Sequence, residues 1–223
     1  MEHRYYGNIP AISPDEQAAL KAKSVLVLGC GGLGGYIIEN LLRMGIGRVT
    51  VVDGDSFDET NLNRQLLCAA DTLGMNKARA AKLRAGAVNP LVEFRAEENF
   101  LDVTNAVEII SGHELVMDAL DNVGSRLLME EVCAGLGIPI IHGAVSGWVL
   151  QAALVTPGSG LLHMLYAGSP DIKTTSTLPM TAQLCASLQC AEALKLLCGR
   201  EPSLENRLLT ADLQHMQWEY ADF

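Results

Sequence analysis

One short segment combines side chains that could neutralise a polyphosphate. An amide, a guanidinium and a second amide, Asn61, Arg64 and Gln65, stand within five positions. If residues 61–66 form one helical turn, the three share a face at i, i+3 and i+4 spacing. Lys77, which opens the next predicted helix, adds a second cation. Two cations directed at a polyphosphate suit in-line attack at phosphorus, in which negative charge must be stabilised and pyrophosphate released.

Two carboxylates precede this segment and leave a simpler alternative open. Asp53 and Asp55 follow an apolar run of strand length, and Asp58 comes shortly after them. Ordinary ion pairs from Arg64 or Lys77 to Asp55 or Asp58 would make the same residues a solvated loop. Asp53 also stands where an acid accepts hydrogen bonds from ribose hydroxyls in nucleotide-binding units.

A glycine turn comes before these residues, between an apolar run and a segment of helical periodicity. Glycines in that position allow a phosphate to approach the backbone at the positive end of a helix. The glycines are Gly29, Gly31, Gly32 and Gly34. Together with Asp53 they equally fit an NAD-dependent dehydrogenase, although hydride transfer would leave Arg64, Gln65 and Lys77 without a role.

A further carboxylate follows a third buried strand. Asp121 and Asn122 come shortly after residues 114–119, again at the carboxyl end of the predicted strand. Mg2+ prefers one or two carboxylates together with phosphate oxygens, so Asp121 is a candidate metal ligand. The alternative is that Asp121 caps the helix predicted to begin near Ser125. His142 ends the next strand, where a lone histidine is more often a hydrogen-bonded structural group than a base.

The apolar patterns predict an α/β fold with a Rossmann-like, doubly wound, mostly parallel sheet continued by antiparallel strands. Strands are expected at 24–29, 48–53, 91–96, 114–119, 139–142, 149–156 and within 208–220. Helices are expected at 14–21, 36–44, 77–87, 125–136 and 181–198, with a polar crossover loop at 168–177. We expect one domain over residues 1–223, in which 13–143 form the nucleotide-binding core and 144–223 the antiparallel continuation.

The composition limits partners and location. Lys and Arg number 16 against 26 Asp and Glu in 223 residues, a formal net charge of −10. Such a charge disfavours nucleic acid or anionic lipid as a partner. The apolar runs are shorter than the ~20 residues of a membrane span, and the first residues lead into no signal peptide. A cytoplasmic protein is expected. Six cysteines without a Cys-x-x-Cys pair predict buried free thiols.

In combination these motifs resemble the HesA/MoeB/ThiF family of ubiquitin-activating-like adenylyltransferases, over nearly the whole chain from Arg4. The motifs are the glycine turn, Asp53-x-Asp55, Asn61-Leu62-x-Arg64-Gln65, Lys77 and Asp121-Asn122. The resemblance implies adenylation, with ATP and Mg2+, of the C-terminal carboxylate of a ubiquitin-like (β-grasp) sulfur-carrier protein. It also implies a homodimer, and sulfur transfer in thiamin, molybdopterin or related biosynthesis. An alternative relative activates a carboxylate on a modified tRNA base.

The resemblance also implies roles for individual residues. The position of Gly32 lies at the phosphates, and Asp53 takes the ribose. The triphosphate is handled by Asn61, Arg64 and Lys77, and Asp121 is the magnesium aspartate, which makes Arg64, Lys77 and Asp121 the expected catalytic residues.

Three departures from the family pattern affect these expectations. Relatives continue the opening Arg-Tyr with an arginine that reaches the partner subunit's ATP site, whereas this chain reads Arg4-Tyr5-Tyr6-Gly7. Either Arg4 substitutes for that arginine or the contact between subunits is absent. Relatives often hold zinc with two Cys-x-x-Cys pairs, which are missing here, so zinc is not expected. The crossover loop reads Lys173-Thr174-Thr175-Ser176-Thr177, without a thiol for a covalent step. With these losses, a catalytically silent binding module is a further alternative.

Overall fold

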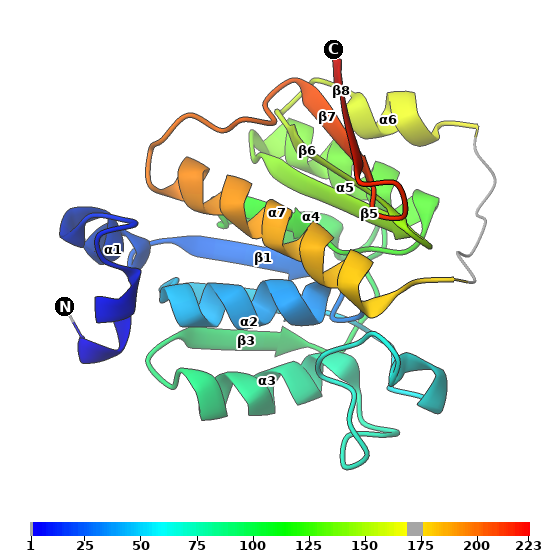
Figure 1. The fold of residues 1–223 in the computed structure, drawn as a ribbon. Helices are drawn as coiled ribbons and strands as arrows, with labels where there is room; N and C mark the ends of the chain where they lie inside the picture. The colour runs from blue at the N-terminus through cyan, green and yellow to red at the C-terminus, as the bar shows by residue number, and fades with distance from the viewer. Residues whose placement is uncertain (1, 169–175) are drawn as a thin grey trace.

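An eight-stranded sheet forms the centre of the molecule, in the order β3-β2-β1-β4-β5-β6-β7-β8 (Figure 1). The computed structural model describes residues 2–168 and 176–223. The strands are β1 Ser24–Leu28, β2 Arg48–Val52, β3 Glu93–Glu97, β4 Leu115–Asp118, β5 Ile140–Ser146, β6 Val149–Val155, β7 Arg207–Asp212 and β8 Gln217–Asp222. Strands β1 to β5 pair in parallel, and β6, β7 and β8 continue the sheet antiparallel. The predicted fold class is confirmed.

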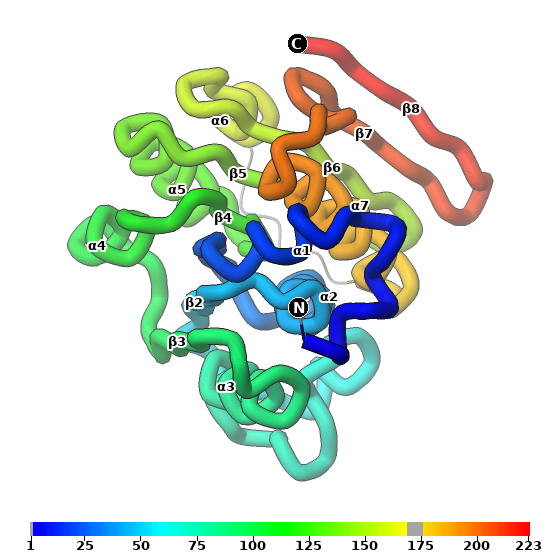
Figure 2. Tube along the Cα trace, turned by 90° about the vertical axis from the view of Figure 1, so that its left-hand side faces the viewer, coloured from blue at the N-terminus to red at the C-terminus, as the bar shows by residue number. Residues whose placement is uncertain are grey.

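Helices cover both faces of the sheet, as the end-on view in Figure 2 shows. The α-helices are α1 Pro14–Leu20, α2 Gly34–Met44, α3 Lys77–Val88, α4 Ala106–Ile110, α5 Val123–Leu136, α6 Leu161–Tyr166 and α7 Pro179–Leu197, with 3-10 turns η1 His3–Asn8 and η2 Glu59–Asn61. One apolar core joins α2, α3 and α7 to the sheet, and a second joins α4, α5 and α6 to its other face.

The alternation of the two cores explains the apolar run of the first strand. Val25 and Val27 belong to one core, whereas Leu26 and Leu28 belong to the other. A central parallel strand is buried on both faces, so every position must be apolar. The outermost strand, β8, differs because all six of its residues are exposed.

Most predicted elements are confirmed within a few residues, and three differences matter for the site. Helix α2 begins at Gly34, two residues before the expected start, so the last glycine of the turn is its first helical residue. Strand β5 runs on to Ser146, past the expected end at His142, because its pairing with β6 continues to the Ser146–Val149 pair. The short helices α4 and α6 were not predicted. Of the predicted crossover loop, residues 169–175 lie outside the described part of the chain.

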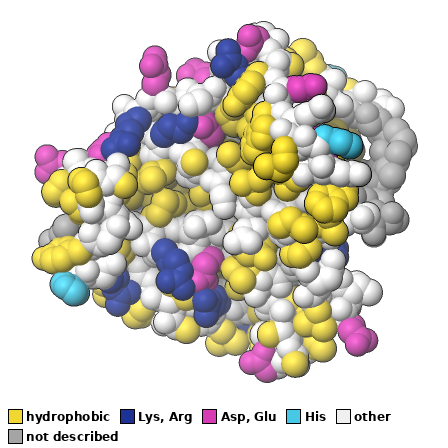
Figure 3. Space-filling view, in the orientation of Figure 1, with side chains coloured by type: hydrophobic (Ala, Val, Ile, Leu, Met, Phe, Trp, Pro, Cys, Tyr) yellow, Lys and Arg dark blue, Asp and Glu magenta, His cyan; other side chains and the backbone are white. Residues whose placement is uncertain are grey.

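The surface seen in Figure 3 carries acidic and basic side chains interspersed with one another. Among the described helices, none combines the length and the apolar character that a membrane crossing would require.

Candidate functional site

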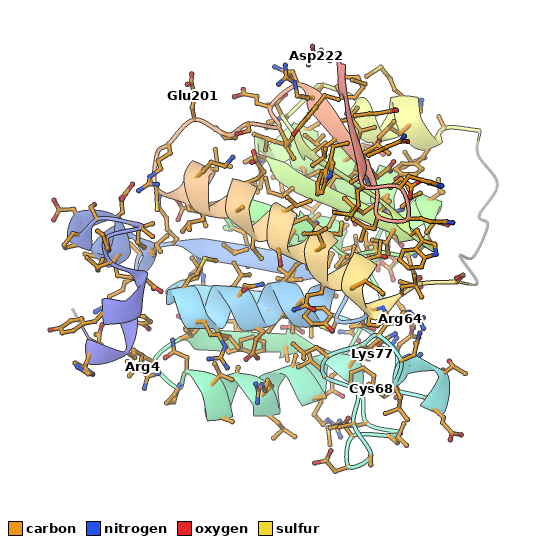
Figure 4. The ribbon with its side chains drawn as sticks, viewed as in Figure 1. Arg4, Arg64, Cys68, Lys77, Glu201 and Asp222 are labelled. Atoms are coloured by element: carbon orange, nitrogen blue, oxygen red, sulfur yellow. The ribbon has the colours of Figure 1, made fainter. Side chains whose placement is uncertain are left out.

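The predicted site residues gather where β1, β2 and β4 end. The glycine turn connects β1 to α2, and Ala119, directly after β4, lies against it, since a Cβ built on Gly29 would be 2.5 Å from the Ala119 carbonyl oxygen. Arg64 and Lys77 lie at this end of the molecule in Figure 4, whereas Arg4 lies at the opposite end. The carboxyl ends of parallel strands therefore share one edge, which is where open α/β sheets bind ligands.

Two glycines of the turn are required by the chain itself. Gly29 has a φ of +98°, in the left-handed region that side chains rarely adopt. A Cβ at Gly34 would lie 1.9 Å from the Gly29 carbonyl oxygen. Any larger residue at these two positions would disrupt the turn, whether or not a ligand is bound.

The other two glycines are not required by packing. A Cβ at Gly31 would come no closer than 3.6 Å to a neighbour, the Gln65 side chain, and one at Gly32 no closer than 3.8 Å, to Arg64. Both distances are ordinary van der Waals contacts. Packing within the chain therefore does not explain why these two residues are glycines, whose backbone lies beside the Gln65 amide and the Arg64 side chain. A cradle in which a phosphate approaches the backbone closely would explain them.

Asp53 is fixed beside the turn by backbone hydrogen bonds. Its Oδ2 accepts from the Cys30 amide at 2.7 Å, and its Oδ1 accepts from the Asp55 amide at 2.9 Å. Burial raises the pKa of Asp53 above its ordinary value, although these two hydrogen bonds act in the opposite direction. Each carboxylate oxygen keeps a lone pair for a further donor, so the geometry is compatible with the expected ribose contact.

The expected helical turn over residues 61–66 forms in part. The amides of Arg64 and Gln65 donate to the Asn61 carbonyl at 3.2 and 2.9 Å. Asn61 is buried, and its Oδ1 accepts from the Asp58 amide at 3.3 Å as half of a capping box around η2. This structural role of Asn61 was not predicted, although a capping residue three positions before an amide is its usual sequence signal.

Arg64 and Gln65 differ in how their polar atoms are used. The Arg64 guanidinium donates to the Thr60 carbonyl at 3.1 Å and to Asn63 Oδ1 at 2.8 Å, both within its own turn. Gln65 is buried against Gly31, and its Oε1 has no hydrogen-bond partner in the described part of the chain. An unpartnered buried amide oxygen is costly, which indicates a group that is incomplete without a ligand or water.

Lys77 opens α3 and reaches back to the site. Its Nζ lies 3.2 Å from Asp55 Oδ2, and its amide donates to the Asp55 carbonyl at 2.8 Å. The ordinary ion pair between Lys77 and Asp55, one of those that the sequence allowed, is therefore present. Because the Asp55 carboxylate is exposed, the pair costs little to rearrange around a bound anion.

The N-terminal cap of helix α5 decides whether Asp121 caps this helix. Asn122, not Asp121, is the N-cap, and its side chain accepts from the Ser125 amide at 2.8 Å. The reading of Asp121 as the helix cap is therefore wrong. Asp121 is exposed, and its Oδ1 lies 3.5 Å from the Asn122 side-chain nitrogen.

Behind this edge lies a cluster of buried polar groups that sequence patterns did not reveal. Asp118 Oδ2 is 2.7 Å from His142 Nδ1 and 3.2 Å from Arg126 Nε. Burial alone would raise the pKa of Asp118, but Arg126 and His142 hold it below its ordinary value. Burial also lowers the pKa of His142, so this ring is neutral near pH 7. The expectation that His142 is a hydrogen-bonded structural group is confirmed.

The six cysteines are free thiols, as predicted. Cys185 is fully buried, its Sγ lies 3.4 Å from the Gln151 carbonyl, and burial raises its pKa to about 12. Within residues 2–168 and 176–223, no three His, Cys, Asp or Glu side chains are grouped so that they could hold a metal ion. A magnesium ion here would need phosphate oxygens as further ligands.

Comparisons with known proteins identify the family and the fold. Residues 4–223 match the ThiF family. The chain is 34% identical over 214 residues to the SAMP-activating enzyme E1 of Haloferax volcanii, covering 93% of this chain and 79% of that protein. It is also 34% identical over 216 residues to the sulfur carrier protein adenylyltransferase of Thermus thermophilus, covering 92% and 80%. A crystal structure of E. coli MccB with ATP has the same fold, with a TM-score of 0.84 at 20% identity, covering 100% of this chain and 72% of MccB.

Proposed function

Because this chain belongs to the ThiF family and is an adenylyltransferase, we propose that it adenylates the C-terminal carboxylate of a small ubiquitin-like sulfur-carrier protein with ATP. The names of two relatives, a SAMP-activating enzyme and a sulfur carrier protein adenylyltransferase, support the class of partner. In this proposal residues 1–223 are one ThiF-type domain, with 13–143 as its nucleotide-binding core.

The observation that carries the proposal is the turn at Gly31 and Gly32, where packing within the chain does not require glycine. The Arg64 side chain lies beside it, as does the Gln65 amide, whose oxygen is unpartnered in the described part of the chain. Lys77 adds a cation that, in the described part of the chain, pairs with the exposed carboxylate of Asp55. A polyphosphate would pair with the two cations, and a hydroxyl of the nucleotide or a water would supply the donor that Gln65 Oε1 lacks. A dinucleotide that transfers hydride would leave both cations without a catalytic role.

Each of these groups has a role in the proposed adenylation reaction. A carrier carboxylate oxygen attacks the α-phosphorus of ATP, the bond to the bridging oxygen breaks, and pyrophosphate leaves. Arg64 and Lys77 stabilise the charge that develops on the phosphate oxygens. Asp53 orients the ribose through its carboxylate oxygens, and the glycine turn holds the phosphates with its backbone amides.

Asp121 is the residue that would hold Mg2+. Its exposed carboxylate follows β4 at the edge that carries the glycine turn, and it has no strong partner in the described part of the chain. One carboxylate together with phosphate oxygens is a donor set that Mg2+ accepts. A bound magnesium ion would neutralise charge on the transferring phosphate.

The dimer and the pathway are further parts of the proposal. Arg4 donates to Asn89 Oδ1 at 2.6 Å, at the end of the molecule opposite Arg64 and Lys77 (Figure 4). If Arg4 replaces the arginine that relatives direct into a partner's ATP site, it must act from a second copy of the chain. The relatives' names connect the carrier to sulfur transfer, which we place in thiamin, molybdopterin or related biosynthesis.

ATP–pyrophosphate exchange tests the proposal directly. The enzyme is incubated with Mg-ATP, labelled pyrophosphate and a panel of β-grasp carriers that end in a glycine carboxylate. Exchange should depend on the carrier and should vanish when its terminal glycine is removed. Exchange that is absent with every carrier, or tighter binding of NAD than of ATP, would refute the adenylation proposal.

A further inference from the structure

Leu120, the residue that precedes Asp121, is held at both of its backbone polar groups. The Leu120 amide donates to Asp118 Oδ1 at 3.0 Å, and the Leu120 carbonyl accepts from Arg126 Nη2 at 2.5 Å. Asp118 and Arg126 also pair with each other, through Asp118 Oδ2 and Arg126 Nε at 3.2 Å. The exposed carboxylate of Asp121 therefore follows a residue whose backbone is fixed by a buried ion pair.

His142 completes this arrangement from β5. Its Nδ1 lies 2.7 Å from Asp118 Oδ2, and since the ring is neutral, Nδ1 carries the proton and donates to the carboxylate. Its Nε2 then accepts, and the Tyr166 hydroxyl at 3.1 Å is the nearer of two possible donors, the other being Gln151 Nε2 at 3.2 Å. The orientation of the Asp118 carboxylate is thus set from two sides, by α5 and by β5.

The backbone of β4 is held at the same point. Gln189, on α7, donates its side-chain amide to the Asp118 carbonyl at 2.8 Å and to the Ile141 carbonyl at 3.1 Å. Asp118 and His142 are 0% exposed and Arg126 is 8% exposed. Side chains from α5 and β5 therefore meet at the Asp118 carboxylate, while α7 holds the Asp118 backbone.

Stability alone does not account for such a cluster. Burying an ion pair costs solvation that its own attraction barely recovers, and apolar residues of similar volume often stabilise a core as well or better. What a buried, fully bonded ion pair does supply is a fixed geometry. Here that geometry is imposed on the backbone of a single residue, Leu120, which precedes Asp121.

We infer that Asp118, Arg126 and His142 are positioning residues for adenylation, which fix the backbone of Leu120 and with it the place of the Asp121 carboxylate. The inference rests on the proposed function, because it gives Asp121 a role at the reacting phosphate. None of the three residues touches the substrate; each acts through the backbone before Asp121.

Variants of His142 and Arg126 test the inference. His142→Leu removes the donor to Asp118, whereas His142→Asn keeps an amide nitrogen close to the position of Nδ1. Arg126→Lys keeps the charge but cannot serve Asp118 and the Leu120 carbonyl together. The matched control is Glu130→Gln, on the same helix, whose buried carboxylate instead accepts from the Leu162 and His163 amides at 2.7 and 2.8 Å.

Three readouts are needed for each variant: kcat and KM for ATP in pyrophosphate exchange, the melting temperature, and hydrogen exchange of the Leu120 amide. His142→Leu and Arg126→Lys should lower kcat about tenfold or more with KM for ATP within about twofold, and should speed exchange of the Leu120 amide. His142→Asn should restore kcat to within about threefold. Glu130→Gln should lower the melting temperature but leave kcat and the Leu120 amide unchanged.

Several results would overturn the inference. A folded His142→Leu variant with unchanged kcat would do so. A Glu130→Gln variant whose kcat falls together with its melting temperature would do so as well, because kcat would then follow stability and not the position of Leu120. If Arg126→Lys does not fold, the two His142 variants decide alone. A wild-type enzyme without exchange activity would refute the proposed function itself, and hydrogen exchange of Leu120 would still show whether the cluster fixes the backbone of this residue.

Discussion

The glycine turn and the buried cluster around Asp118 lie at the same edge of the sheet, yet they use their polar groups in opposite ways. At the turn, called the incomplete region below, Gln65 Oε1 is unpartnered among the described residues and lies beside glycines that packing does not require. In the cluster, called the complete region below, both oxygens of the Asp118 carboxylate accept hydrogen bonds from protein groups. The contrast concerns this carboxylate and not every atom around it, because Gln189 Oε1 is also unpartnered among the described residues. The proposal assigns ligand binding to the turn and structural support to the cluster.

Other buried carboxylates of the described chain follow the pattern of the cluster. Glu130 accepts from two amides at the start of α6, and Glu192 Oε2 accepts from the Ser203 and Leu204 amides at 2.8 and 2.9 Å. The exposed Asp121 does not follow it. A carboxylate without strong partners next to a fully bonded one is therefore the feature that distinguishes the candidate site.

Asp121→Ala should have the largest effect on activity. If the carboxylate acts at the reacting phosphate, pyrophosphate exchange should fall at least about 100-fold, because a group that stabilises transition-state charge has no substitute. The melting temperature should stay close to that of wild type, since Asp121 is exposed and does not cap α5. Glu131→Ala, an exposed carboxylate on α5, is the control and should keep full activity. Unchanged exchange in Asp121→Ala would remove this residue from the mechanism.

A pair of glycine variants separates binding from folding within the turn. Gly34→Ala should cost about 3 kcal/mol of unfolding free energy or more, because its Cβ would lie 1.9 Å from the Gly29 carbonyl oxygen. Gly32→Ala should unfold at nearly the wild-type denaturant concentration, since its Cβ meets nothing closer than 3.8 Å. It should nevertheless bind ATP at least about tenfold more weakly in calorimetry. Equal ATP affinity in Gly32→Ala would mean that the nucleotide does not approach the backbone of Gly32 closely.

Nucleotide choice is the next test of the incomplete region. Mg-ATP at about 100 times its dissociation constant should raise the melting temperature by about 5 °C, because only the folded chain presents the cradle. NAD should have little effect, since Arg64 and Lys77 match a triphosphate. A larger shift with NAD would favour the dehydrogenase alternative that the glycine turn and Asp53 leave open.

Because the complete region contains a buried histidine, the free energy of unfolding should depend on pH. Burial lowers the pKa of His142 and also that of His113, whose ring lies 2.9 Å from Thr50 Oγ1. Below the ordinary value of 6.5 the unfolded chain binds protons that the folded chain does not, so unfolding free energy should fall as the pH drops below that value. Urea unfolding at pH 8, 6.5 and 5.5 measures the loss. His142→Asn and His113→Gln should each flatten the curve, and an unchanged slope in both would contradict the assignment.

How far the sequence predicted each region follows from the range of the interactions involved. The glycine turn, Asp53 and the segment from Asn61 to Gln65 could be predicted because their signals are local and their elements are long and periodic. The strands and most helices followed for the same reason. The short helices α4 and α6 carry too few turns to show a period.

The cluster could not be predicted because its members are far apart in the chain. Asp118 and His142 are separated by 24 positions, and Gln189 lies 71 positions from Asp118. Each residue alone fits a helix or strand without chemistry. The end of β5 was placed too early for a related reason: Gly143 looked like a strand end. In the structure it leaves space for Gln189, whose side chain would be 2.4 Å from a Cβ at that position.

The smallest effect on activity is expected from replacing cysteines. These variants test whether the reaction ends at the carrier adenylate. Cys185 lies on α7 with its Sγ 3.4 Å from the Gln151 carbonyl, and burial raises its pKa to about 12, so almost none of it is thiolate at neutral pH. Cys190, five positions further along α7, is equally buried and its pKa is also raised to about 12. Adenylation needs no thiol, because the carrier's carboxylate attacks and pyrophosphate leaves.

Replacing Cys185 or Cys190 by Ala should therefore leave pyrophosphate exchange within about twofold of wild type, with any larger loss following the melting temperature. Cys198→Ser, at a half-buried position, is the matched control for the loss of a thiol without a cavity in the core. Mass spectrometry of enzyme, carrier and ATP under non-reducing conditions gives the decisive measurement. The described geometry predicts a free carrier adenylate and no adduct. A carrier-sized mass on Cys185, removable by a reducing thiol, would show instead that this buried residue becomes exposed during turnover and that the reaction continues past the adenylate.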